Sequence, residues 1–451
     1  MQFMEPLGTT DGSIEASWDH LKQRWRPDLV EVTREMAPPM MRWGGLFSSY
    51  YRWREGVGPR TKRKPMHNLV WGGVESNQIG TAEFVDFCKQ VGSEPLMCVN
   101  FAAEGHPPWV TNALGEARAG DAAEAADWVA YCNDPENKER LAHGQRETLP
   151  IKYWQLGNET SFALTRFKKP EAIAKTIEFA RAMRKVDPTI KLIAWGDSGW
   201  APDMIKECGD LIDMVAFHHL FDPGPPCNDA AFRKNPAVTW DVLMAAVDRQ
   251  EKKIKDIRQQ SKNFPLALTE SHFSMQGRNR CDLNSTWAVG VAYARFLNLH
   301  QRHGDVLKIA NLGDFCGTRW QSNVVMLPTP GGKAYVMPVG KVSALYSQHT
   351  GKQSVAVSGM PKELDVVASR TDDKYFLHVV NTSTNQAQQC RVLIEGVTLK
   401  KGKAWEITAA DPFAEITSAK DDPMTTKTRD VDLATPITFP AASVTVVELQ
   451  S

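Results

Sequence analysis

The stretches Trp154-Gln155-Leu156-Gly157-Asn158-Glu159 and Leu266-Ala267-Leu268-Thr269-Glu270 decide the fold of this chain, because in each a mainly apolar run ends abruptly at a glutamate. A continuously apolar run is typical of a strand buried on both faces of a parallel sheet. In a parallel barrel, the carboxyl ends of the strands open onto the active-site face. The two stretches therefore predict that Glu159 and Glu270 meet on one face of a barrel.

Apolar runs alternate with amphipathic helical patterns through about residue 350. The helical patterns include residues 81–91, 171–186, 240–259 and 287–302. The apolar runs cover residues 2–5, 40–43, 94–101, 151–157, 191–196, 213–218, 265–270 and 308–313. Strand–helix units in this number predict an α/β fold. We expect a (β/α)8 TIM barrel over residues 1–350, with Glu159 ending the fourth strand and Glu270 the seventh.

The pattern changes after about residue 350. Short β-rich segments at residues 364–368, 375–380, 390–395, 404–408 and 443–449 are separated by polar, turn-rich stretches. This pattern is typical of an antiparallel sandwich. We expect a C-terminal all-β sandwich domain over residues 351–451, with residues 409–436 forming a long irregular loop.

The charge and cysteine content limit which function and which cellular location we expect. Lys plus Arg and Asp plus Glu both number 53, so no net charge attracts nucleic acid or an anionic membrane. No apolar run reaches the roughly 20 residues that span a bilayer. The first residues lack the basic and apolar regions of a signal peptide, and the eight cysteines are scattered without a CxxC pair. We expect reduced thiols and a cytoplasmic protein, with secretion left open if a leader was removed.

Two glutamates on one barrel face suit the hydrolysis of glycosidic bonds. A retaining mechanism uses two carboxyl groups about 5–5.5 Å apart, one as acid/base and one as nucleophile. The acid must hold its proton near neutral pH, which burial beside a second carboxylate favours. The alternative is that each glutamate only ends a strand and pairs with an arginine.

The Trp-x-Leu-Gly-Asn-Glu phrase resembles the acid/base motif of the α-L-arabinofuranosidases of glycoside hydrolase family 51. That family belongs to the clan A barrel hydrolases, whose catalytic glutamates lie on strands four and seven. Further stretches that resemble the family are residues 42–45, 51–60, 75–81, 125–133 and 308–312. The resemblance implies a retaining glycoside hydrolase that removes terminal α-L-arabinofuranosyl residues from plant-type oligosaccharides or polysaccharides. It also suggests a homo-oligomer.

The resemblance implies roles for residues near the cleaved bond. Glu159 would be the acid/base and Glu270 the nucleophile, and Asn158 would bind a ring hydroxyl beside the bond. Glu5 matches a first-strand glutamate that binds the terminal sugar, although an exposed terminal residue is the alternative. Arg42 matches an arginine that supports the site, for which a structural ion pair is an equal explanation.

One further candidate residue matches a tryptophan that the family has near the sugar pocket. Others stand at positions where this sequence departs from the family. Trp71 matches the tryptophan, with a place in the core as the alternative. Leu46 stands where the family has a sugar-binding asparagine, and Asp314 where it has a glutamine. Ser271-His272 stands where the family tends to have Trp-Asn after the nucleophile. Loss of a buried polar partner can change substrate preference by about 10⁴-fold, so the reaction type is better supported than the sugar.

The His218-His219-Leu220-Phe221 stretch replaces the family's His-x-Tyr-Tyr and lacks a sugar-contacting tyrosine. Adjacent histidines in a strand point to opposite faces, so His218 and His219 make a poor metal-chelating pair. We expect no metal ion and no cofactor, with both histidines treated as substrate-binding candidates. Same-clan alternatives are a β-xylosidase, a β-glucosidase or an endo-β-1,4-glucanase. An alternative of another class is a non-catalytic carbohydrate-binding protein.

Overall fold

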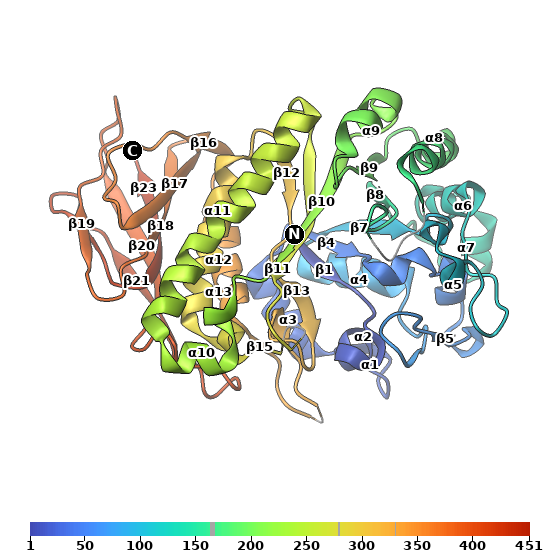
Figure 1. Ribbon diagram of the computed structural model, residues 1–451, viewed down its shortest axis with the longest axis horizontal. Coiled ribbons are helices and arrows are strands. Elements are labelled where there is room, and N and C mark those ends of the chain that lie inside the picture. Colours follow the sequence, from blue (N-terminus) through green and yellow to red (C-terminus); the bar gives the residue numbers. More distant parts are fainter. Residues whose placement is uncertain (163–166, 278–279, 330) are drawn as a thin grey trace.

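A sheet of eight parallel strands forms the centre of the larger part of the molecule (Figure 1). The structure is a computed structural model that describes residues 1–162, 167–277, 280–329 and 331–451. In sheet order, the strands are β1 (Gln2–Met4), β4 (Met40–Trp43), β7 (Glu94–Val99), β8 (Tyr153–Leu156), β9 (Lys191–Trp195), β10 (Met214–Phe221), β11 (Leu266–Phe273) and β12 (Leu307–Ala310). The amino group of Met1 donates to the carbonyl of Ala310 at 2.9 Å, which brings the first and last strands together.

A helix follows each of these strands along the chain, which completes the α/β barrel expected from the sequence. The helices are α3 (Pro27–Met36), α4 (Thr81–Val91), α6 (Ala122–Asn133), α8 (Lys169–Val186), α9 (Ala201–Cys208), α11 (Pro236–Ser261), α12 (Trp287–Arg302) and α13 (Pro338–Gln348). Local sequence fixes their ends. In α4, the Glu83 carboxylate accepts from the backbone N–H of Gly80 at 2.9 Å, and Gly92 ends the helix at φ +75°.

The loops that join the barrel strands and helices contain further short helices and strands. After β1 and β4 they are α1 (Gly8–Asp11), α2 (Ser13–Ser17), β2 (Trp18–Asp19), β3 (Arg24–Trp25), η1 (Leu46–Ser49), η2 (Trp53–Gly56), η3 (Arg60–Lys62), β5 (Met66–His67) and β6 (Val74–Glu75). Later ones are η4 (Ala102–Gly105), α5 (Pro107–Val110), α7 (Lys138–Ala142), η5 (Pro225–Cys227), α10 (Asp229–Lys234), η6 (Asp282–Ser285), β13 (Asp314–Gly317), β14 (Asn323–Met326) and β15 (Tyr335–Val336).

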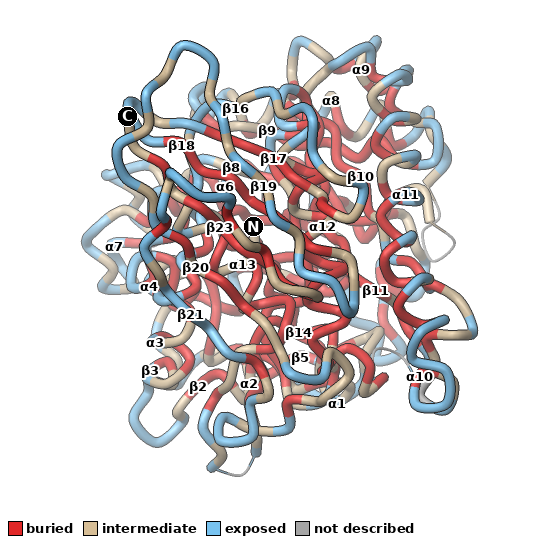
Figure 2. Tube along the Cα trace, turned by 90° about the vertical axis from the view of Figure 1, so that its left-hand side faces the viewer, coloured by how far each residue is buried: buried red, intermediate tan, exposed pale blue. Residues whose placement is uncertain are grey.

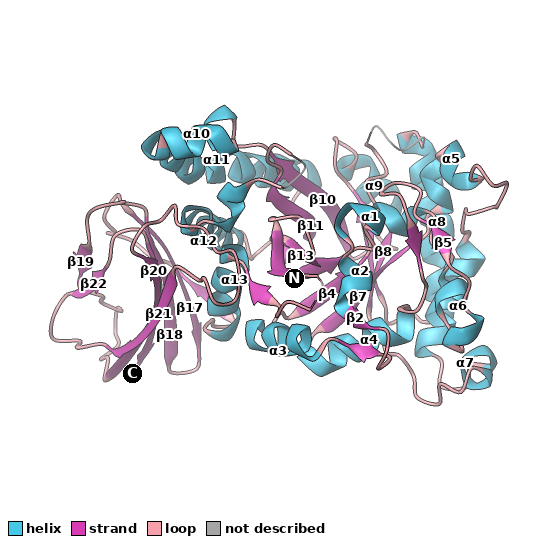
Figure 3. Ribbon diagram, turned by 90° about the horizontal axis from the view of Figure 1, so that it is seen from below, coloured by secondary structure: helices cyan, strands magenta, loops and turns pink. Residues whose placement is uncertain are grey.

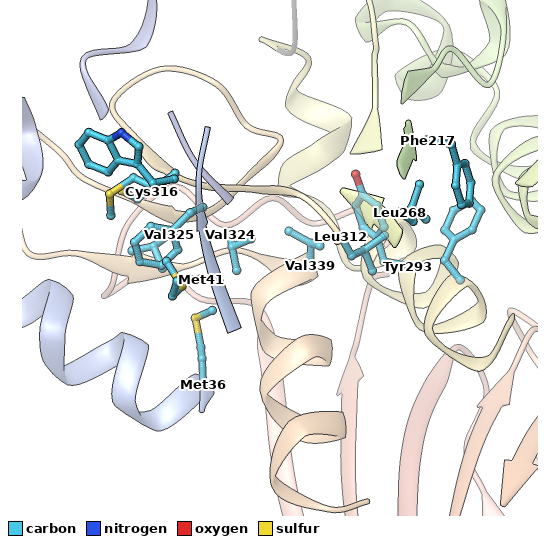
Figure 4. Close-up of a cluster of buried hydrophobic side chains, with 14 of the residues drawn as sticks. Met36, Met41, Phe217, Leu268, Tyr293, Leu312, Cys316, Val324, Val325 and Val339 are labelled. Carbon is cyan, nitrogen blue, oxygen red and sulfur yellow. The ribbon is translucent and has the colours of Figure 1, made fainter. Parts of the chain in front are cut away.

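Alternate side chains of the barrel strands enter two different apolar layers. Leu96, Ile193 and Ala216 belong to a cluster inside the barrel, whereas their neighbours contact the surrounding helices. Figure 4 shows part of this outer layer, in which Phe217 and Leu268 lie beside Tyr293 of α12. Figure 2 shows the buried backbone running through the middle of the molecule. Full burial of one such side chain contributes about 1.5–3 kcal/mol.

A β-bulge in β11 reverses this alternation near the carboxyl end of the strand. Phe217 pairs with Leu268 but His218 pairs with Glu270, so Thr269 is an extra residue in β11. Before the bulge, Ala267 faces the barrel interior. Beyond it, Glu270 lies on the inner side and Ser271 on the side of α11, where its hydroxyl receives a 2.8 Å hydrogen bond from Gln250.

The C-terminal part is all β, as expected, and its main sheet is antiparallel throughout. In sheet order its strands are β16 (Gln353–Val355), β17 (Leu364–Thr371), β18 (Lys374–Asn381), β23 (Ser443–Gln450), β20 (Lys401–Ala409) and β21 (Met424–Asp430), and β19 (Gln388–Cys390) with β22 (Ile437–Phe439) forms a second sheet. Val444 and Val446 join the barrel core, whereas Val447 and Leu449 face the opposite side.

Helices α12 and α13 lie between the barrel and the C-terminal sheet (Figure 3). Twelve of the sixteen residues of α12 are buried, including Trp287, whose indole N–H donates to the carbonyl of Ala442 at 2.7 Å. A helix that is apolar around most of its circumference is covered on several sides. The division of the chain at residue 350 stays a proposal: α13 ends at Gln348, and β16 begins at Gln353.

The expectation of an irregular loop over residues 409–436 was wrong. Within it, β21 pairs with β20 from Met424 to Asp430. Its threonines and basic residues made it look like a loop, but they suit an exposed edge strand. The segment before β21 lies against the barrel, where the carbonyl of Pro412 accepts from the N–H of Ala288 at 2.7 Å.

All eight cysteines are free thiols, and seven of them are buried. This agrees with the expectation that they do not pair. In the part of the chain that the structure describes, no helix has the length and apolar character needed to cross a membrane.

Candidate active site

The structure brings Glu159, Glu270 and His218 together at the carboxyl ends of β8, β10 and β11. One carboxylate oxygen of each glutamate and one ring nitrogen of His218 all lie within 4.8 Å of one another. The three residues are buried, with 8% of Glu159, 7% of Glu270 and 3% of His218 exposed. Two carboxyl groups in such an enclosed place cannot ionise independently.

Arg42 of β4 ties this cluster together from inside the barrel. Its guanidinium is fully buried and donates to Glu270 Oε1 at 2.8 Å, to Asn158 Oδ1 at 2.7 Å and to Gln155 Oε1 at 2.9 Å. Glu270 is the carboxylate among these partners, so it neutralises the buried positive charge. The structural ion pair considered as an alternative for Arg42 is thus present, and it lies within the site.

His218 lies between the two glutamates. Its Nδ1 is 3.0 Å from Glu159 Oε1 and 3.6 Å from Glu270 Oε2, while its Nε2 is 2.9 Å from the hydroxyl of Thr269. Burial lowers the pKa of His218 to about 4, so the imidazole is neutral near pH 7. A neutral imidazole carries one N–H, which leaves the other nitrogen free to accept from Thr269.

A tight turn after β8 presents Glu159. Gly157 and Glu159 both have left-handed backbone conformations, with φ of +76° and +55°. Such a φ is uncommon for a residue with a side chain and costs about 1–3 kcal/mol unless the surroundings hold it. The N–H of Asn158, between them, donates to Glu104 Oε1 at 2.9 Å.

Burial raises the pKa of both glutamates, but their surroundings differ. Burial, aided by the negative charge of Asp197, raises the pKa of Glu159 to about 7, while Arg42 and His272 oppose the rise. Burial also raises the pKa of Glu270, opposed by His218 and by the Arg42 hydrogen bond. Because the guanidinium bonds Glu270 directly, the shared negative charge resides on Glu270 and the proton on Glu159.

Glu5 and Trp71 form a second part of the site. Glu5 Oε1 accepts from the Trp71 indole N–H and from the Phe47 N–H, both at 3.0 Å. Burial and the charge of Glu270 raise the pKa of Glu5 well above its usual range. Gly45 leaves room for this carboxyl, because a Cβ there would lie 2.3 Å from it. Leu46, the next residue, is buried and offers no polar group.

His272 of β11 and Asp314, the first residue of β13, lie together. His272 Nε2 is 3.7 Å from Asp314 Oδ1, and Asp314 Oδ2 accepts from the hydroxyl of Ser322 at 2.7 Å. His272 lies two residues beyond Glu270 in β11, and therefore on the same side of the strand. Both side chains are buried and polar.

His219 does not enter the cluster. Its Nδ1 is 3.3 Å from Gln250 Nε2, and its ring stacks on Phe221 at 4.5 Å between centroids. Strand alternation turns it toward α11, away from His218. Its expected role in binding substrate is therefore not supported by its position.

Glu159, His218 and Glu270 form a group that could hold a metal ion. The guanidinium of Arg42 already supplies a positive charge 2.8 Å from Glu270, and a second cation beside it would be repelled. The donor set therefore suits a proton-sharing carboxyl pair better than a metal.

Several known proteins resemble the chain in sequence or in structure. Residues 32–234 match the sequence model of the alpha-L-arabinofuranosidase 1 domain, and residues 266–443 match that of the alpha-L-arabinofuranosidase C-terminal domain. The thermostable family 51 α-L-arabinofuranosidase of Thermotoga petrophila superposes with a TM-score of 0.77 at 25% identity, over 99% of this chain and 95% of that one. The chain is a family 51 arabinofuranosidase-like protein.

Two curated relatives are similar to parts of this arabinofuranosidase-like protein. The probable alpha-L-arabinofuranosidase C of Aspergillus clavatus is 36% identical over 216 residues, which are 43% of this chain and 40% of that protein. The intracellular exo-alpha-(1->5)-L-arabinofuranosidase of Streptomyces lividans is 28% identical over 342 residues, 69% of this chain and 48% of that protein. The chain thus spans less than half the length of either relative.

Several residues of the arabinofuranosidase-like site were not predicted from the sequence. Gln155 lies within the decisive motif and contacts Arg42, and Thr269 precedes Glu270 and contacts His218. Asp197 follows β9, so its place at a strand end was the available signal. Glu104 follows β7 in an irregular turn and had no comparable signal.

Proposed function

We propose that this protein is a retaining glycoside hydrolase that removes terminal α-L-arabinofuranosyl residues from plant-type oligosaccharides or polysaccharides. The observation that carries the proposal is the buried pair of Glu159 and Glu270, with His218 between them and Arg42 hydrogen-bonded to Glu270. One carboxylate oxygen of Glu159 lies within 4.8 Å of one carboxylate oxygen of Glu270. This separation is compatible with carboxyl groups about 5–5.5 Å apart, as in retaining enzymes, and is shorter than the about 6.5–9.5 Å of inverting ones.

In the first step, Glu270 acts as the nucleophile. A carboxylate oxygen of Glu270 forms a bond to the anomeric carbon while the bond from that carbon to the leaving oxygen breaks. Glu159 gives its proton to the leaving oxygen. Arg42 keeps Glu270 ionised, and the pKa of Glu159, about 7, keeps the acid protonated near neutral pH.

In the second step, the same groups run in reverse. Glu159, now ionised, takes a proton from water as the water oxygen bonds to the anomeric carbon. The bond to Glu270 breaks and its electron pair returns to the carboxylate, so the sugar leaves with its original configuration. Neutral His218 holds the Glu159 carboxyl in place by a hydrogen bond without adding charge.

Other polar groups would bind the sugar. The Nδ2 of Asn158 is buried and has no hydrogen-bond partner among the described residues, which suits a donor reserved for a sugar hydroxyl. Glu5 and Trp71 offer a second binding group, and His272 and Asp314 a third. This site is built for several hydroxyl contacts around one sugar, which supports action on a terminal residue.

The arabinofuranoside is the first choice of substrate because the relatives carry that name. The departures at Leu46, His272 and Asp314 favour a second candidate, a same-clan enzyme such as a β-xylosidase, β-glucosidase or endo-β-1,4-glucanase. A pure carbohydrate-binding protein would not need a proton-sharing carboxyl pair. We place the protein in the cytoplasm, because the Streptomyces lividans relative is named intracellular and the thiols here are free. We propose no cofactor.

The test is hydrolysis of a panel of nitrophenyl glycosides that includes α-L-arabinofuranoside, β-D-xyloside and β-D-glucoside, with wild type, Glu270→Ala and Glu207→Ala. Glu207 lies on α9 with its side chain 48% exposed, which makes it a matched control. The proposal is supported if wild type and Glu207→Ala hydrolyse the arabinofuranoside and Glu270→Ala does not. NMR should then show that the first-formed sugar keeps the anomeric configuration of the substrate. Turnover of another glycoside instead would assign a different sugar specificity to the same mechanism. Binding of glycosides without turnover would favour the non-catalytic carbohydrate-binding alternative.

A further inference from the structure

Glu104 is a buried carboxyl next to the site that the mechanism above does not use. It lies in η4 after β7 and is 0% exposed. Ala102, Ala103 and Glu104 have φ of +51°, +49° and +52°, so three successive residues with side chains adopt the left-handed conformation. Backbone of this kind is held only where its surroundings require it. The N–H of Ala103 donates to Asn100 Oδ1 at 3.0 Å, which fixes the turn from one side.

The carboxyl of Glu104 contacts the turn that carries Glu159. Glu104 Oε1 accepts from the N–H of Asn158 at 2.9 Å. A Cβ on Gly157 would lie 2.6 Å from the same oxygen, so the glycine makes the close approach possible. The two left-handed segments, one after β7 and the other after β8, therefore hold each other through this carboxyl.

We infer that Glu104 is a positioning residue, which fixes the Gly157-Asn158-Glu159 turn and so aims the Glu159 carboxyl at the leaving oxygen. The inference rests on the proposed function. The Glu104 carboxyl has no hydrogen bond to Glu270 or Arg42 among the described residues, and its Oε1 accepts from the Asn158 N–H. Burial raises the pKa of Glu104 to about 8, so the group is mainly neutral near pH 7 and holds the turn without placing a charge beside Glu159.

A poor leaving group needs a proton from the acid, whereas a good leaving group departs without one. Comparing the two kinds of substrate therefore distinguishes a misplaced acid from a general structural defect. The experiment compares kcat/KM for 2,4-dinitrophenyl and alkyl α-L-arabinofuranosides in wild type, Glu104→Ala and Glu104→Gln. A misplaced acid can cost about 10²-fold in rate. We expect Glu104→Ala to lose about 10²-fold on the alkyl substrate and less than about threefold on the dinitrophenyl one. Glu104→Gln keeps an acceptor for Asn158 and should keep the wild-type ratio of the two rates.

Equal losses on both substrates would overturn the inference, because a structural defect reduces the active fraction for every leaving group alike. If Glu104→Ala does not fold, Glu104→Gln decides: selective loss of the alkyl substrate would mean that Glu104 acts on the proton itself. Wild type that hydrolyses neither arabinofuranoside is a failure of the proposed function instead. The same comparison is then made with whichever glycoside the wild type cleaves.

Discussion

Arg42 and Glu270 meet inside the barrel, with Nη1 and Oε1 2.8 Å apart and the guanidinium completely buried. They lie on β4 and β11, which are not neighbours in the sheet. The other two groups that accept from Arg42 are the amide oxygens of Gln155 and Asn158. Glu270 is thus the counterion of Arg42, and this relationship distinguishes it from Glu159.

Replacing Arg42 should damage both activity and folding. Lysine cannot donate in three fixed directions, so Arg42→Lys should lower kcat/KM by about 10²-fold. A broken buried pair should lower the free energy of unfolding by about 3 kcal/mol. Steady-state kinetics and urea unfolding measure the two effects. Arg54→Lys is the control, because Arg54 is 41% exposed and its ion pairs contribute little. Equal effects of the two variants would contradict the prediction.

Removal of the nucleophile should stop every glycosidic reaction of the protein. Glu270→Ala should lower kcat by more than about 10⁴-fold on dinitrophenyl and alkyl substrates alike. Both leaving groups need the attack, whether or not they need a proton. Stopped assays with each substrate measure this loss. Residual activity that depends strongly on the leaving group would assign Glu270 a different role.

The pH profile should report the protonation of Glu159. The acid works when protonated, so kcat/KM for a poor leaving group should fall as pH rises through about 7, the pKa to which burial raises this group. Activity should also fall at low pH, where Glu270 takes up a proton. In Glu159→Ala, the alkaline limb should vanish, leaving slow turnover of the dinitrophenyl substrate only. An unchanged alkaline limb in that variant would place the titrating acid elsewhere.

Trp71 should affect binding more than chemistry. Trp71→Phe keeps an aromatic ring but loses the N–H that donates to Glu5 at 3.0 Å. One such hydrogen bond contributes about 1 kcal/mol, which corresponds to about fivefold in affinity. We expect KM to rise by about that factor while kcat stays within twofold or so. A fall in kcat at constant KM would mean that Glu5 acts on the transition state.

A tryptophan outside the site should control stability. Trp287→Phe removes the indole N–H from the buried carbonyl of Ala442. An unsatisfied buried carbonyl costs about 1–3 kcal/mol. Thermal and urea unfolding should show a loss of this size, with kcat/KM per folded molecule unchanged. No change in stability would show that water replaces the lost donor.

The sequence predicted features that depend on local pattern. The barrel strands coincide with mainly apolar runs of the sequence, and Glu159 and Glu270 follow two of these runs. Features that depend on contacts between distant residues were harder to predict from the sequence. Counting alternate residues from Ala267 would turn Glu270 away from the barrel interior, and only the extra residue Thr269 reverses this. A bulge depends on pairing with the neighbouring strand, so one strand read alone does not reveal it.

Two other misses have similar causes. Glu104 is the third of three successive residues with left-handed backbone, and no residue type in that stretch predicts the turn. In β21, polar residues reflect an exposed edge rather than a loop, because one side of the strand faces water. Both depend on which neighbours the fold supplies. Alternation along β10 turns His219 toward α11, and its contact with substrate stays a prediction.

Helix α12 packs against both the barrel and the C-terminal sheet. Cutting the chain after residue 350 would leave α12 and α13 with one apolar side facing water. The barrel is therefore not a free-standing unit, and a shortened protein should aggregate rather than work. Heating the intact chain should melt both parts in one transition, because the sheet cannot detach without opening the core that positions β11 and its glutamate.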